Sequence, residues 1–280
     1  MKLTKYIAVA CCFIIWWDNT PAQNYLTEQF DLARSLYSKE NYYDAVTELK
    51  RLLFFDSTSA YAFEANYLAG VCYKKGAKLS EAIYHFTLAE INANSVQQLY
   101  DSKIQQIRCN ILRRTTSRAL DLLDSVSADE IFNQYKSQLV YWRGWAYIFS
   151  NRWKEASEEF ASLDSAKELY ELTLKVSENS YSPRTSRLLS YFIPGAGQFY
   201  TGNYLSGILS LGWNILWGYL TIESFIEDRV FDGILIANFL WLRFYNGNLY
   251  NAEKFAKDEN LNLYNEALYY LQYKFKGSKP

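Results

Sequence analysis

The sequence predicts an all-α protein in two parts: an array of helical hairpins, then a C-terminal hairpin of two membrane-spanning helices. Alanines recur every 37 residues through the first half of the chain. In the second half, residues 204–222 carry no charge, and a helix of that length is about 28 Å long, close to the thickness of a bilayer core. Between the two parts, residues 182–203 hold two prolines and three glycines, which break helices.

The composition argues against several classes of function. The formal net charge is -1 and no basic stripe is present, so we expect no binding to nucleic acid. The single histidine, His85, has no acidic or cysteine companion at ligand spacing, so we expect it on an exposed helix surface and predict no metal site. No catalytic triad or phosphate-binding loop appears, so we expect no catalytic residues, no cofactor and no enzyme activity.

The N-terminal segment, residues 1–22, has the pattern of a signal peptide. Two lysines precede an apolar run at 6–17, and small residues follow at positions suited to cleavage before Gln23. The run is too short for a spanning helix, which needs about 20 residues. An alternative is lipid attachment at Cys11, but only five apolar residues would precede that cysteine. We therefore expect an exported chain that begins at Gln23.

The 37-residue period predicts four pairs of antiparallel helices within the domain 23–177. In the pattern, a small residue on the first helix faces a large apolar residue on the second, which allows close packing. The periodic positions are Ala33, Gly70, Ile107 and Gly144; Leu36, Tyr73, Asn110 and Tyr147; Ala45, Ala82, Ala119 and Ala156; and Leu49, Phe86, Leu123 and Phe160. The second helices are expected at about 37–50, 74–90, 111–126 and 148–164.

On these residues, the segment 26–163 resembles the tetratricopeptide repeat family. The second and fourth units match best, and the third departs from the pattern at Ile107 and Asn110. The period of 37 exceeds the usual 34, which implies longer turns. The resemblance implies a solenoid whose first helices form a concave face that binds a protein or peptide.

If that register holds, one set of side chains forms a partner groove. Aromatic rings beside basic side chains are typical of interface hot spots. Packing of the same aromatics between repeats remains the alternative. The groove residues are Phe30, Arg34, Tyr67, Lys74, Arg108, Tyr141 and Trp145. The two cysteines that remain after export, Cys72 and Cys109, are expected to be buried and unbridged, because packed helix axes usually keep Cα atoms too far apart for a disulfide.

The repeats are followed by a boundary and a membrane domain. Ser165–Glu168 reads as a capping box that starts one more helix, through about Val176. We place a linker at 178–187, a hydrophobic hairpin domain at 188–250, and an amphipathic C-terminal helix and tail at 251–280.

The hairpin consists of the uncharged run 204–222, a charged turn, and a second apolar segment at 233–245. Arg243 is costly in a bilayer, and we expect it to reach the membrane surface from near the end of the second helix. The alternative is a buried pair of core helices in a soluble protein.

The pentapeptide 199–203 (FYTGN) reappears as 244–248 (FYNGN), and a hairpin would bring both copies to one membrane face. The residues around the first copy resemble a P-G-x-G-x-x-Y-x-G motif that precedes the first helix of small two-transmembrane-helix domains in bacterial envelope proteins. The resemblance covers about 182–257 and carries no catalytic residue. The motif residues are Pro194, Gly195, Gly197, Gln198, Tyr200 and Gly202.

Together these features predict an envelope scaffold or adaptor, with its repeats in the periplasm, a protein or peptide in its groove, and membrane lipid around its hairpin. Basic residues on the repeat side of the hairpin oppose that orientation by the positive-inside rule, but we give precedence to the export signal. One alternative is an accessory factor for outer-membrane or envelope protein assembly. Another is a component of a membrane enzyme or transporter.

Overall fold

The computed structural model describes residues 20–280, and over that range the chain is all-helical, with 82% helix and no strand. This confirms the predicted fold class at the level of all-α. The expected signal peptide lies outside the described residues except for its last three, which begin helix α2 (Thr20–Ser38).

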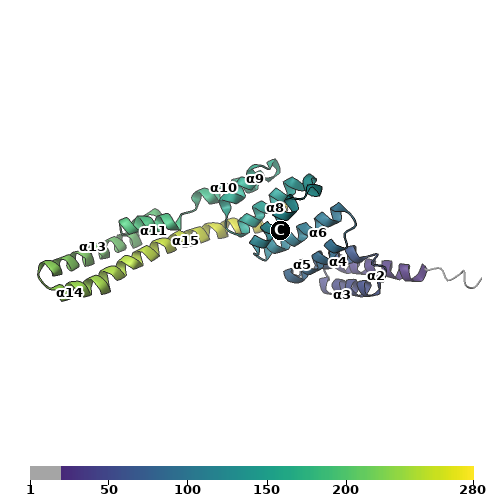
Figure 1. The fold of residues 1–280 in the computed structure, drawn as a ribbon, viewed down its shortest axis with the longest axis horizontal. Helices are drawn as coiled ribbons and strands as arrows, with labels where there is room; N and C mark the ends of the chain where they lie inside the picture. The colour runs from purple at the N-terminus through teal and green to yellow at the C-terminus, as the bar shows by residue number, and fades with distance from the viewer. Residues whose placement is uncertain (1–19) are drawn as a thin grey trace, which may run out of the picture. The chain divides into compact units, whose positions relative to one another are not determined.

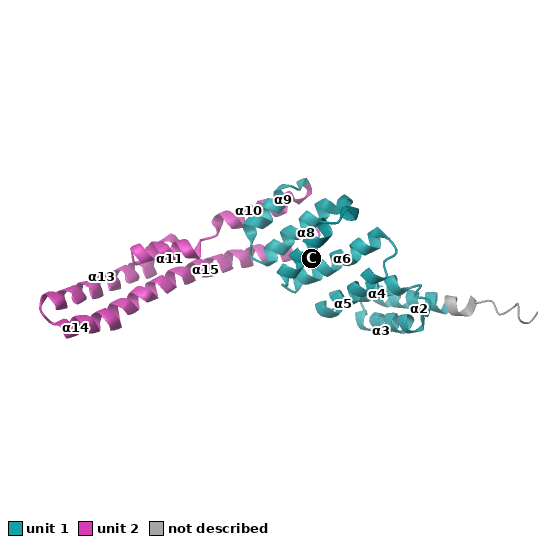
Figure 2. Cartoon of the chain, in the orientation of Figure 1, with its two compact units in different colours: residues 1–164, 280 teal, residues 165–279 magenta. Residues whose placement is uncertain are grey.

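The chain forms two compact units, which Figure 2 colours separately: unit 1 is Met1–Asp164 with Pro280, and unit 2 is Ser165–Lys279. The division falls before the boundary expected at 178. Helix α10 (Lys167–Asn179) belongs to unit 2 because it packs on α15 (Leu242–Tyr273), where Tyr270 Oη donates to Glu168 Oε1 at 2.6 Å. The expected capping box does not form, since Ala166 is the N-cap and makes no side-chain bond.

Unit 1 is a succession of helices, each of which packs mainly on its neighbours along the chain (Figure 1). The helices after α2 are α3 (Tyr42–Phe55), α4 (Ala62–Lys75), α5 (Leu79–Ile91), α6 (Val96–Leu112), α7 (Thr116–Ser127), α8 (Lys136–Phe149) and α9 (Trp153–Ala161), with 3-10 turns at Glu130–Tyr135 and Asp164–Ala166. The expected second helices began too early: the expected range 37–50 starts inside α2, whereas α3 starts at Tyr42.

A left-handed residue explains these later starts. Within each pair, one residue after the first helix has φ between 57° and 61°. The next residue then donates its N–H back to a carbonyl in the last turn of that helix, at 2.9–3.0 Å. The left-handed residues are Glu40, Ala77, Arg114 and Asn151, and the accepting carbonyls belong to Leu36, Tyr73, Asn110 and Tyr147. This closes each helix with the same C-terminal cap, although glycine, the usual residue there, is absent from all four sites. The degenerate third unit has the same turn as the others.

In the first, second and fourth pairs, the small and large residues pack as the period predicts. A Cβ added to Gly70 would lie 2.7 Å from the Phe86 ring, and one added to Gly144 would lie 2.4 Å from the Phe160 ring. In the first pair, Ala33 and Leu49 are both fully buried in one core cluster. Glycine on one helix therefore accompanies phenylalanine on the other, and alanine accompanies leucine.

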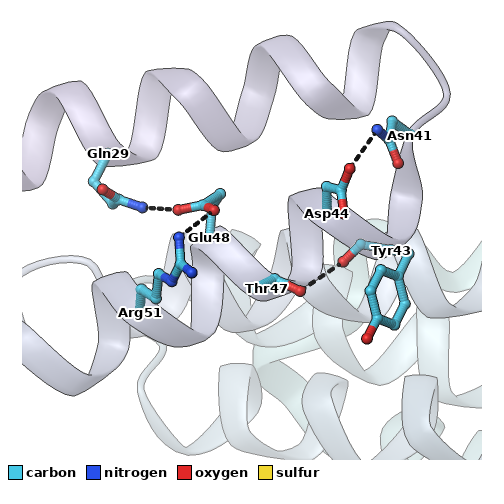
Figure 3. A network of polar contacts seen from close by, with 7 residues as sticks. All are labelled: Gln29, Asn41, Tyr43, Asp44, Thr47, Glu48 and Arg51. Atoms are coloured by element: carbon cyan, nitrogen blue, oxygen red, sulfur yellow. Dashed lines mark hydrogen bonds and ion pairs between the residues drawn. The ribbon is translucent and has the colours of Figure 1, made fainter.

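Polar side chains also make contacts within the first helix pair, α2 and α3 (Figure 3). Gln29 of α2 donates its amide to the carboxylate of Glu48 on α3, and Arg51 Nη1 lies 2.7 Å from Glu48 Oε1. At the start of α3, Asn41 Nδ2 donates to Asp44 Oδ2 at 2.7 Å.

Unit 2 continues after α10 with α11 (Pro183–Phe192), α12 (Ala196–Tyr200) and α13 (Tyr204–Ile226). The chain then reverses through Asp228, whose φ is 59°, into α14 (Val230–Leu235), a π-helix η3 (Ile236–Trp241) and α15. These last three elements follow one another without a gap and pack along α13 (Figure 1). The helix expected at the C-terminus is thus the end of α15, and α11 begins inside the expected linker.

The packing of small against large residues gives a first prediction. Gly144→Ala should lower the free energy of unfolding by about 1–3 kcal/mol, because its Cβ cannot fit under Phe160. The double variant Gly144→Ala/Phe160→Leu copies the Ala33–Leu49 pair and should recover most of that loss in urea unfolding followed by circular dichroism. Gly76→Ala is the matched control, since its Cβ would meet nothing closer than 3.5 Å. A double variant no more stable than Gly144→Ala would contradict this account.

Candidate functional site

The predicted groove residues come from four first helices of unit 1, and the structure brings part of them together. Lys74 of α4 donates Nζ to Gln105 Oε1 on α6 at 3.2 Å, and Gln105 Nε2 donates to Tyr67 Oη at 3.4 Å. The guanidinium of Arg108 lies 4.6 Å from the ring centroid of Trp142 on α8. Sequence reasoning missed Gln105 and Trp142, which lie next to predicted positions.

The electrostatics of this cluster are those of a positively charged surface. Burial, together with the nearby positive charge of Arg108, lowers the pKa of Lys74 to about 8. Burial also lowers the pKa of Arg108. Both cations are only half-buried and are flanked by the Tyr67 and Tyr141 rings, whose own pKa values burial raises. A carboxylate would lower the energy of such a site.

Three other predicted groove residues differ in how much of their side chains is exposed. Trp145 is 2% exposed and belongs to the core, so it cannot offer a contact surface, and the packing alternative holds for it. Phe30 and Arg34 line a hollow of about 640 Å³ together with Tyr67. The Arg34 side chain is exposed there and lies 3.9 Å from Asp31 Oδ1. The predicted groove residues therefore fall in two places, an open hollow on α2 and α4 and a positively charged cluster on α4 and α6.

His85 is buried, which corrects the expectation of an exposed residue. It is 6% exposed, its Nδ1 lies 3.0 Å from Asn66 Oδ1, and its ring stacks on Tyr73 at 5.2 Å. Burial, reinforced by the Lys50 charge, lowers its pKa to about 4. His85 and Asn66 stand 37 residues after Glu48 and Gln29, so two successive helix pairs share one polar contact between their helices. His85 thus has a structural role.

Cys72 and Cys109 are buried and unbridged, which confirms the expectation. Burial raises the pKa of each thiol to about 11, so little reactive thiolate is present at neutral pH. Within residues 20–280, no group of three or more histidine, cysteine, aspartate or glutamate side chains could hold a metal ion.

In unit 2, the glycines of the predicted membrane motif have clear backbone roles. Gly195 has φ 92°, and a Cβ there would lie 2.4 Å from the Gly207 carbonyl oxygen. A Cβ on Gly197 would lie 2.1 Å from the Ser186 carbonyl oxygen. Gly202 has φ 78° in the turn before α13. Side chains at Gly195 and Gly197 are therefore excluded by close contacts between backbones.

The motif glutamine belongs to a buried polar cluster, which we define as Ser186, Ser190, Gln198 and Asn248, all at most 2% exposed. Asn248 Oδ1 accepts from the Gly195 N–H at 2.8 Å, and Asn248 Nδ2 donates to the Ser190 carbonyl at 3.0 Å. Gln198 Nε2 donates to the Asn248 carbonyl at 3.1 Å, and Ser190 Oγ donates to Gln198 Oε1 at 3.0 Å. The cluster joins α11, α12 and α15.

The two FYxGN copies take different roles in this arrangement. Asn248, from the second copy, is central to the polar cluster, whereas Asn203 of the first copy bonds within its own turn, to the Thr201 carbonyl at 3.3 Å. Sequence reasoning named Gln198 and missed Asn248. Tyr200 lies nearby, where its hydroxyl accepts from the Ser182 N–H at 3.4 Å, and Pro194 directly precedes the Gly195 turn.

The hairpin of α13 with α14, η3 and α15 is inverted in polarity relative to a soluble protein. The residues of α13 that it buries are small or polar: Gly207, Asn214, Gly218, Thr221 and Ser224. The large apolar residues face outward, with Leu205 73%, Ile215 62%, Ile226 77% and Phe231 72% exposed. Tyr204–Ile226 is the one helix within the described residues long and apolar enough to cross a membrane, and only 22% of its apolar window is buried. Most of α13 is therefore not covered by the other described residues of this chain.

Comparison with protein-family models, with curated proteins and with solved structures finds no match to this chain.

The buried histidine gives a second prediction, on pH. The unfolded chain protonates His85 near its ordinary pKa of 6.5, whereas the folded protein resists protonation until about pH 4. Stability due to neutral His85 is thus complete above pH 6.5 and is lost as the pH falls toward 4, by roughly 3 kcal/mol. His85→Gln removes this loss, so the stability difference between the wild type and the variant should shrink between pH 7 and pH 4 in urea unfolding. A difference that stays constant over that range would contradict this account.

Proposed function

We propose that this chain is a membrane-anchored adaptor of a bacterial cell envelope. Unit 1 is a tetratricopeptide-like array that holds a protein or peptide partner on the face formed by its first helices. The hairpin of unit 2 crosses the membrane, and the export signal places unit 1 in the periplasm. The chain has a binding role in this proposal and no catalytic one.

The inverted polarity of the hairpin is the observation that carries the membrane part. Leu205, Ile215 and Phe231 expose large apolar surfaces, which water disfavours at about 25 cal/mol per Å² and lipid does not. Small residues between the helices, such as Gly218 under Trp241, are typical of helix contacts in bilayers, where close packing replaces the hydrophobic effect. Each feature is unfavourable in water and ordinary in lipid.

The exposed Arg243 is the residue that opposes this arrangement most. It stands between Trp241, which packs at Gly218, and Phe244, which stacks on Trp213 at 5.4 Å. Arg243 therefore lies beside the middle of α13, whereas the sequence suggested a position near the end of the second helix. A charge at this depth is costly in hydrocarbon, so the guanidinium is expected to draw water or a lipid headgroup toward it.

The repeats support the binding part of the proposal. The same left-handed turn recurs in all four helix pairs, including the pair whose sequence departs from the pattern. On the first helices, Lys74 and Arg108 lie among the Tyr67, Tyr141 and Trp142 rings, a combination that suits a partner with acidic side chains.

A third prediction tests the anchor. The full chain, expressed in bacteria, should stay in the membrane fraction through an alkaline carbonate wash, since the outward apolar side chains require lipid. A chain that ends at Asp164, the last residue of unit 1, should be released as a folded helical protein. Release of the full chain by carbonate would rule out the membrane hairpin.

A fourth prediction tests the groove. A photo-crosslinking residue in place of Gln105 should capture a partner in intact cells, and the additional change Arg108→Glu should abolish that capture by reversing the charge. Arg118, exposed on the second helix α7, offers the matched control, because Arg118→Glu should leave the capture unchanged. Equal loss in both variants, with unchanged circular dichroism, would show that the face carrying Arg108 is not the binding face.

A further inference from the structure

Exposed apolar surface in unit 2 is not confined to the hairpin. Helix α11 directs Leu188, Leu189, Phe192 and Ile193 outward, and these are 55%, 40%, 74% and 59% exposed. Its opposite face carries Ser186 and Ser190, which are fully buried against other parts of unit 2. Helix α11 is thus inverted in polarity in the same way as α13.

The contacts of α11 show how far it runs along the long helix. Arg187 in the middle of α11 lies 3.2 Å from Glu253. Further along α11, the Ser190 carbonyl accepts a bond from Asn248, and the Tyr191 carbonyl accepts one from Tyr245. Helix α11 therefore runs antiparallel to α15, away from the charged region around Glu253 and Lys257. Its end reaches the part of α15 just after Phe244, which packs on the Trp213 and Trp217 rings of α13.

At that end the chain reverses, and side chains pair with several backbone groups of the reversal. The Gly195 N–H donates to Asn248 Oδ1 at 2.8 Å, and the Gly197 N–H donates to Ser190 Oγ at 2.8 Å. Ser186 Oγ lies 3.1 Å from the Gly197 carbonyl and donates to it. At a wet surface, water would satisfy these groups. In hydrocarbon each unpaired group costs several kcal/mol, so a reversal there requires side-chain partners of this kind.

Resting on the membrane anchoring proposed above, we infer that α11, the Pro194–Gly195 turn and α12 form a re-entrant segment of the membrane domain. The segment enters the leaflet next to the base of the hairpin, reverses at Gly195 and returns through α12 on the same side. Leu188, Leu189, Phe192 and Ile193 contact lipid acyl chains. The occupant is lipid because the apolar face of α11 adjoins that of the hairpin, and because the polar cluster supplies the bonds that lipid cannot.

The experiment measures depth in the full chain by fluorescence quenching. Single cysteines at Phe192→Cys, Leu216→Cys and Lys257→Cys carry a bimane label, in a background with Cys11 and Cys12 replaced by serine. Buried Cys72 and Cys109, whose thiol pKa values are raised, do not compete for the label, which the background protein without a new cysteine verifies. The protein is reconstituted in vesicles of phosphatidylcholine and phosphatidylglycerol that contain nitroxide-labelled acyl chains.

The inference expects the label at 192 to lose most of its fluorescence, as the label at 216 does, while the label at 257 keeps it. A bright label at 192 beside a quenched one at 216 would overturn the re-entrant segment and leave the anchor intact. A bright label at 216 would overturn the anchor itself, and the re-entrant segment with it. Disulfide formation between Phe192→Cys copies, with no quenching at 192, would assign the face to a second copy of the chain and also overturn the inference. Leu188→Cys repeats the measurement if Phe192→Cys disturbs folding.

Discussion

The Asn248 side chain makes the contacts on which unit 2 depends. Its amide accepts from the Gly195 N–H and donates to the Ser190 carbonyl, which joins α15 to α11 and to the turn between α11 and α12. A buried donor left without its partner costs about 1–3 kcal/mol, and here one side chain satisfies groups on two elements. The close approach of Gly195 to Gly207 and the start of α13 follow from the position of that turn.

The two units solve the burial problem in opposite ways. Unit 1 buries large apolar residues such as Phe86 and Phe160 over glycines, together with polar contacts between helices such as His85 with Asn66. Unit 2 buries serine, asparagine and glutamine and exposes leucine, isoleucine and phenylalanine. In both units, buried polar groups need hydrogen-bond partners. This difference in what faces outward is the reason for the proposal that water surrounds unit 1 and lipid surrounds the hairpin of unit 2.

The sequence predicted much of this because periodicity reports packing. The small residues at Gly70 and Gly144, the phenylalanines that cover them and the all-α class follow from spacing alone. The starts of the second helices could not be predicted in this way. The left-handed positions before them are Glu40, Ala77 and Arg114, and no glycine marks these turns in the sequence.

Contacts between distant segments also could not be predicted from local sequence patterns. The FYxGN repeat predicted that its two copies lie at one face, but not that Asn248 of the second copy meets Gly195. Gln105 is half-exposed, three residues before the predicted groove residue Arg108. His85 and Trp145 show a different limit. Their helices were predicted, but a small error in the angular position of a residue on a helix decides whether its side chain faces solvent or core.

The most direct test of the role of Asn248 is amide hydrogen exchange in lipid nanodiscs, read at Gly195 and Gly197. The account predicts exchange as slow at these two glycines as within α13. It also predicts that Asn248→Leu makes them exchange rapidly, whereas Asn246→Leu, at the exposed neighbouring asparagine, leaves them protected. Rapid exchange at Gly195 in the unaltered protein would contradict the account, because the turn would then be held by something other than Asn248.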